Sequence, residues 1–71
     1  MTIESKLKKV FESIPYEVLT VDRWGSDFRV ILLTNKYTML SGVEVLSVYE
    51  RNIQLIIRHG NVAAFLERYG D

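Results

Sequence analysis

The clearest hydrophobic pattern in the chain is the run Phe-Arg-Val-Ile-Leu-Leu that follows Asp27. One side of such a strand carries Phe28, Val30 and Leu32, and the other side carries Ile31 and Leu33. A strand that is apolar on both faces needs cover on both faces. We therefore predict a strand over residues 27–34, and the other elements must be placed relative to it.

An amphipathic helix precedes this strand. Apolar side chains recur at helical spacing between residues 3 and 14 and form a stripe about 100° wide. Thr2 can cap the first turn, Glu4 complements the positive end of the helix, and Pro15 stops it. We predict a helix over residues 3–13.

A strand and a turn connect this helix to the hydrophobic run. Residues 16–23 alternate loosely and are rich in β-branched side chains, which predicts a strand. The connection Trp24-Gly25-Ser26 has a glycine where the chain must turn, so the two strands should form an antiparallel hairpin. Because an isolated hairpin is marginally stable in water, the helices must cover it.

Residues 43–58 are predicted to form one helix. Their polar side chains share an arc of about 120°, and apolar side chains occupy the opposite arc. Ser41 and Glu44 have the spacing of a capping box, and Gly60 suits the position just beyond the last turn. Apolar residues beside the main stripe widen it, so such a helix would need cover on two sides.

The same residues also fit a second hairpin. Val43–Tyr49 would then pair with Ile53–His59 across residues 50–52, and six β-branched side chains favour this alternative. That turn would contain neither glycine nor proline, which is unusual for a hairpin. The helix is therefore our prediction, and the hairpin remains the alternative.

The last predicted element is a short helix after Asn61, a good N-cap, with one apolar face and Gly70 at its end. The predicted fold class is α+β: a single domain over residues 1–71 in which an antiparallel β-hairpin packs against helices in the order α-β-β-α-α. The alternative for residues 43–58 gives a four-stranded antiparallel meander flanked by helices.

Composition limits the classes of function. The 71 residues contain no cysteine, which excludes disulfides and thiolate metal sites, and nine basic residues balance nine acidic ones. Neutrality argues against nucleic-acid binding, which depends on neutralising phosphates. No apolar run approaches the roughly 20 residues that span a bilayer. The first residues lack the apolar core of a signal peptide, so we expect a cytoplasmic protein without membrane contact.

The first forty-one residues resemble the BolA-like family, whose fold is similar to a type II KH domain. The matching text includes Glu17-Val18, Val21-Asp22 and the run from Phe28 to Tyr37. In that family a glycine, a serine and an Arg-His-Arg triplet follow, and the histidine is offered to an iron–sulfur cluster shared with a monothiol glutaredoxin. A gapless alignment places Val45-Leu46-Ser47 at the triplet, so the histidine that would bind the cluster is missing from this chain. We therefore expect no cofactor.

A second resemblance depends on the alternative hairpin. Residues 57–60, Ile-Arg-His-Gly, are similar to the Tyr-Lys-His-Ala segment of the Hfq branch of Sm-like proteins, which bind RNA as rings. Both resemblances therefore imply a nucleic-acid-binding module as an alternative function. The candidate contacts for that function are the basic and aromatic residues Lys8, Lys9, Arg23, Trp24, Arg29, Arg58 and His59.

Catalytic and metal-binding patterns are missing from the sequence. His59 is the only histidine, and neither an orienting partner nor metal-ligand spacing accompanies it. The hydroxyl groups lack the context of a nucleophile elbow, and the glycines are too dispersed to form a phosphate-binding loop. We predict no catalytic residue, no metal site and no enzymatic activity.

The wide apolar arc of residues 43–58 predicts a protein interface instead. Unburied apolar surface of this kind marks an interaction site, and a second copy of the chain is the simplest cover. We therefore predict a protein-interaction or regulatory module that forms a homo-oligomer, most simply a homodimer, and that can also take a protein partner. Ile56→Glu should break the assembly. The candidate interface residues are Val45, Val48, Tyr49, Leu55 and Ile56.

Overall fold

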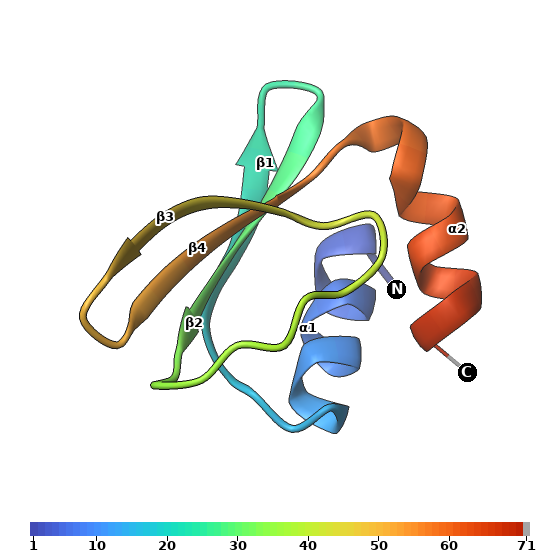
Figure 1. Cartoon of the computed structure of the whole chain (residues 1–71). Coiled ribbons are helices and arrows are strands. Elements are labelled where there is room, and N and C mark those ends of the chain that lie inside the picture. The colour runs from blue at the N-terminus through green and yellow to red at the C-terminus, as the bar shows by residue number, and fades with distance from the viewer. Residues whose placement is uncertain (71) are drawn as a thin grey trace.

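The computed structural model describes residues 1–70 and contains two helices and a four-stranded antiparallel sheet (Figure 1). This confirms the predicted α+β class. In chain order the elements are α1 (Ile3–Ser13), β1 (Glu17–Trp24), β2 (Asp27–Leu33), β3 (Glu44–Tyr49), β4 (Asn52–Ile57) and α2 (His59–Tyr69).

Helix α1 has the predicted bounds and the predicted cap. The hydroxyl of Thr2 accepts a hydrogen bond from the backbone N–H of Ser5 at 3.1 Å. Leu7, Val10 and Phe11 form the buried face of the helix, as the apolar stripe indicated.

The two strands of the first hairpin begin and end within one residue of the predicted bounds. Strand β1 pairs with β2, and Trp24 lies opposite Asp27 across the turn. Gly25 has a φ of 67°, a conformation that glycine adopts without a steric cost. A bulge between Val18 and Thr20 interrupts the register of β1.

Residues 43–58 do not form the predicted helix. They form a second hairpin, β3 and β4, joined by Glu50 and Arg51. Glu50 turns the chain with a φ of 54°, so a glutamate occupies a conformation that usually requires glycine. Strand pairing favours the hairpin over the helix. Every residue of β4 is paired with a residue of β2, and Ile53 and Leu55 lie opposite the apolar residues Leu32 and Val30.

The sheet order is β1-β2-β4-β3, so β4 lies inside the sheet and β3 at its edge. The four-stranded alternative is therefore correct in strand number and antiparallel pairing, but a meander would have kept the strands in chain order. A connection over residues 34–43 carries the chain past β4 to the edge (Figure 1). Tyr16 and Tyr69 hold this connection, because their hydroxyls accept the backbone N–H groups of Thr38 and Ser41, each at 2.9 Å.

Both helices cover the same face of the sheet. Phe11 of α1 stacks on Phe65 of α2 with ring centroids 5.4 Å apart. The strands contribute every second residue to the same core, from Phe28, Val30 and Leu32 of β2 and from Ile53, Leu55 and Ile57 of β4. Within residues 1–70 the opposite face carries no helix, and Ile56 is the buried side chain of β4 on that side.

Helix α2 begins at His59, two residues before the predicted cap at Asn61, and ends at Gly70 as predicted. Arg58 occupies the N-cap position, but its side chain makes no hydrogen bond to the first turn of the helix. The cap comes from the first hairpin instead, because Asp27 accepts the backbone N–H of His59. The sequence around Asn61 gave no sign of this tertiary contact.

Candidate interaction site

Strand β3 is the most exposed strand of the sheet. All six of its residues are exposed, and its main packing partner is β4. Figure 1 shows the β3–β4 hairpin extending away from α2, so the turn of this hairpin lies far from the helix layer. The exposed fractions of its apolar residues are 41% for Val45, 46% for Leu46, 63% for Val48 and 74% for Tyr49.

The run from Val45 to Tyr49 contains no charged residue. Natural sheets usually protect an exposed edge with charges, proline, bulges or a covering element. Apart from the charge of Glu44 at its start, strand β3 has one of these devices, a bulge between Val45 and Ser47. The other edge strand, β1, is better protected because α1 packs against it. We call residues 45–49 the β3 edge.

The structure divides the predicted interface residues into two groups. Val45, Val48 and Tyr49 are exposed on the β3 edge and remain candidates. Leu55 is 0% exposed and Ile56 is 3% exposed, so both are buried within the chain and cannot provide a surface. Leu55 belongs to the core under the two helices, and Ile56, on the opposite face of the central strand β4, lies between its paired neighbours Arg29 and Glu44.

Leu46 is a candidate that sequence reasoning missed. It is the unpaired residue of the bulge, between the paired positions Val45 and Ser47, and its side chain is half exposed. Leu19 occupies the equivalent position in β1, unpaired between Val18 and Thr20 and 47% exposed. No local pattern marks either bulge, since a bulge is a property of strand pairing.

Two of the predicted nucleic-acid contacts lie together on the helix-free face. The Arg29 guanidinium lies 4.5 Å from the ring centroid of Trp24. It also donates two hydrogen bonds to the Asp22 carboxylate, at 2.7 and 3.1 Å. This hydrogen bonding raises the pKa of Arg29 and lowers the pKa of Asp22. The positive charge that a phosphate would need is therefore already paired.

Arg58 and His59 are likewise engaged within the chain. Arg58 donates to Glu44 at 3.2 and 3.3 Å and to Asp27 at 3.2 Å. The hydrogen bonds to Glu44, followed by the one to Asp27, raise the pKa of Arg58. The imidazole Nδ1 of His59 lies 3.7 Å from Asp27.

The other predicted contacts are spread over the molecule. Lys8 lies on α1 and pairs with Glu12 at 3.8 Å, and Lys9 lies on the same helix. Arg23 is at the end of β1, where its guanidinium lies 5.1 Å from the ring centroid of Phe28. The fold thus does not gather the seven residues into one basic surface.

The described residues form neither a metal site nor a membrane-spanning helix. Among residues 1–70, no group of three histidine, cysteine, aspartate or glutamate side chains could hold a metal ion. In the same range, no helix is both long and apolar enough to cross a membrane.

Comparisons with family models, curated proteins and solved structures found no match to this chain. They leave the BolA-like and Sm-like resemblances untested. The residues that align with the family's Arg-His-Arg triplet lie on β3, within Glu44–Tyr49.

Proposed function

We propose that this chain is a non-catalytic protein-interaction module that self-associates through the β3 edge. The observation that carries the proposal is an exposed strand at the edge of the sheet, of which residues 45–49 carry no charge. Such an edge presents backbone N–H and C=O groups with which another strand can pair. The proposed role is that of a regulator, inhibitor or adaptor.

A second copy of the chain is the partner that fits this edge best. Antiparallel pairing of two β3 strands about a two-fold axis is self-complementary and would join two four-stranded sheets into one. The zero net charge of the chain does not oppose the approach of two copies. Covering Val48 and its neighbours also removes apolar surface from water, at about 25 cal/mol per Å².

The positions of the charged residues near the β3 edge support antiparallel pairing of two β3 strands. Glu44 begins β3 and is paired with Arg58, and the remaining charges of the hairpin lie in its turn, at Glu50 and Arg51. The middle of the strand can therefore approach an identical strand without bringing two like charges into contact.

Sedimentation equilibrium over the micromolar range tests self-association directly. We expect the wild-type chain to form a dimer and Leu46→Lys to raise the dimer dissociation constant by at least tenfold, because like charges would meet across the interface. Leu19→Lys is the matched control, since Leu19 is the exposed bulge residue of the other edge strand.

Two outcomes would overturn the proposal. One is a wild-type chain that stays a folded monomer at the highest concentration measured. The other is dissociation caused by Leu19→Lys to the same extent as by Leu46→Lys, which would move the interface away from β3. Circular dichroism of both variants ensures that each is folded.

A further inference from the structure

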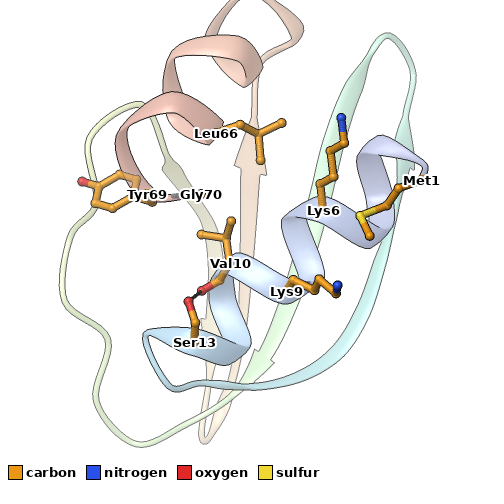
Figure 2. Close-up of a pocket in the computed structure, with 8 residues that line it drawn as sticks. All are labelled: Met1, Lys6, Lys9, Val10, Ser13, Leu66, Tyr69 and Gly70. Carbon is orange, nitrogen blue, oxygen red and sulfur yellow. Dashed lines mark hydrogen bonds between the residues drawn. The ribbon is translucent and has the colours of Figure 1, made fainter.

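A groove between the two helices is separate from the β3 edge. Its volume is about 670 Å³, and Figure 2 shows its lining residues on α1 and α2 and next to the ends of these helices. Val10 and Leu66 extend from the two helices into the space between them (Figure 2). The lining residues are Met1, Lys6, Lys9, Val10, Ser13, Leu66, Tyr69 and Gly70.

The spacing of these residues matches the packing surface of a helix. On α1, the positions 6, 9, 10 and 13 are related as i, i+3, i+4 and i+7, so they form one stripe. On α2, Leu66 and Tyr69 are related as i and i+3, and Gly70 follows them as the C-cap. Two such stripes facing one groove form the ridges between which a third helix can pack.

The charge of the groove is one-sided. Lys6 and Lys9 are exposed on its α1 side, and none of the described lining residues is acidic. The third lysine of the helix, Lys8, does not line the groove and is paired with Glu12. An occupant that carries carboxylates next to an apolar stripe would complement this arrangement.

We propose that the groove binds an acidic amphipathic helix of a protein partner. The apolar stripe of that helix would pack on the half-buried Leu66 and Tyr69, with the buried Val10 beneath them, and its flanking carboxylates would meet Lys6 and Lys9. The lining comes from two helices and from Met1 and Gly70 next to their ends, which suits a helix lying along them better than a small molecule that must be enclosed on most of its surface. This inference goes beyond the proposed self-association and does not depend on it.

Fluorescence anisotropy with a labelled synthetic peptide tests the proposal. The peptide has about 18 residues, long enough to form a helix, with leucines at helical spacing and glutamates on both sides of that stripe. A second peptide has lysine in place of each glutamate. We expect the acidic peptide to bind at least about tenfold more tightly than the basic one.

A pair of double variants locates the binding site. Lys6→Gln with Lys9→Gln removes the groove charges, while Lys8→Gln with Lys36→Gln removes the same total charge elsewhere. We expect the first pair to weaken binding of the acidic peptide about tenfold and the second to change it less than twofold.

Three results would overturn the proposal: no binding of the acidic peptide, equal weakening by both double variants, or displacement of the peptide by micromolar decanoate, which would assign the groove to a small amphiphile. The oligomeric state of the Lys6→Gln, Lys9→Gln variant should equal that of the wild-type chain. Loss of peptide binding with the dimer intact thus separates failure at the groove from failure at the β3 edge.

Discussion

The Asp27 carboxylate accepts a hydrogen bond from the backbone N–H of His59 at 2.9 Å, although the two residues are 32 positions apart in the chain. This contact caps α2 from the start of β2 and also brings Asp27 within 3.2 Å of Arg58. One side chain thus holds the first hairpin, the end of β4 and the beginning of the last helix together.

The first prediction concerns this cap. Asp27→Ala should lower the melting temperature by several degrees, because the backbone N–H of His59 loses its acceptor. Asp27→Asn keeps an acceptor and should lower it less. Thermal unfolding followed by circular dichroism measures both. Equal melting temperatures for the wild-type chain and Asp27→Ala would show that the cap contributes nothing.

The second prediction concerns pH. The hydrogen bond from the His59 backbone, ahead of the contacts with Arg58, lowers the pKa of Asp27, and the Arg29 guanidinium lowers that of Asp22. A lowered pKa means that the stabilisation is fully present above the ordinary carboxyl value of about 4 and is lost as pH falls through the folded value. The melting temperature should therefore fall more steeply below pH 4 in the wild-type chain than in Asp27→Asn. Parallel curves would contradict this.

The third prediction separates folding from assembly. Because Ile56 is 3% exposed within one chain, Ile56→Glu should unfold the protein rather than dissociate a dimer, contrary to what the sequence pattern predicted. Urea denaturation should show that the free energy of unfolding falls by more than about 3 kcal/mol. Val48→Glu is the control on an exposed site, and it should remain folded. A folded, monomeric Ile56→Glu chain would restore the earlier prediction.

The fourth prediction addresses the turn of the second hairpin. Glu50 has a φ of 54°, so Glu50→Gly should stabilise the chain by about 0.5–1 kcal/mol by removing a steric cost. Arg51 lacks a positive φ, and Arg51→Gly should destabilise it by adding freedom to the unfolded chain. Urea denaturation of the two variants measures both changes. Destabilisation by Glu50→Gly would show that the glutamate side chain makes a contribution larger than the strain.

The fifth prediction tests how the connection over residues 34–43 is held. Tyr16→Phe and Tyr69→Phe should each cost about 0.5–1.5 kcal/mol, because a backbone N–H of the connection loses its acceptor. Tyr37 is the matched control: its hydroxyl is buried and makes no well-aligned hydrogen bond among the described residues, although the backbone of Leu40 lies beside it, and burial raises its pKa. Tyr37→Phe should therefore be neutral or stabilising. Equal losses in all three variants would contradict the assignment.

Residues 3–34 show how much local sequence can determine. The helical stripe from Ile3 and the cap at Thr2 act within a few residues, and Gly25 supplies the φ that its turn needs. Each of these signals is local, so the first helix and the first hairpin could be predicted closely. The α+β class followed from them.

Residues 43–58 were decided by tertiary structure. Their polar side chains fit one face of a helix, yet pairing β4 between β2 and β3 buries Leu55 and Ile57 completely, which a lone helix with the same residues would not achieve. The turn at Glu50 contains no glycine, so the sequence does not indicate a turn there. Likewise, the exposed β3 edge and the groove beside Lys6 exist only because of the order of the strands and the placement of two helices on one face. Hydrophobic periodicity records which residues prefer burial, whereas pairing partners far apart in the chain determine what covers them.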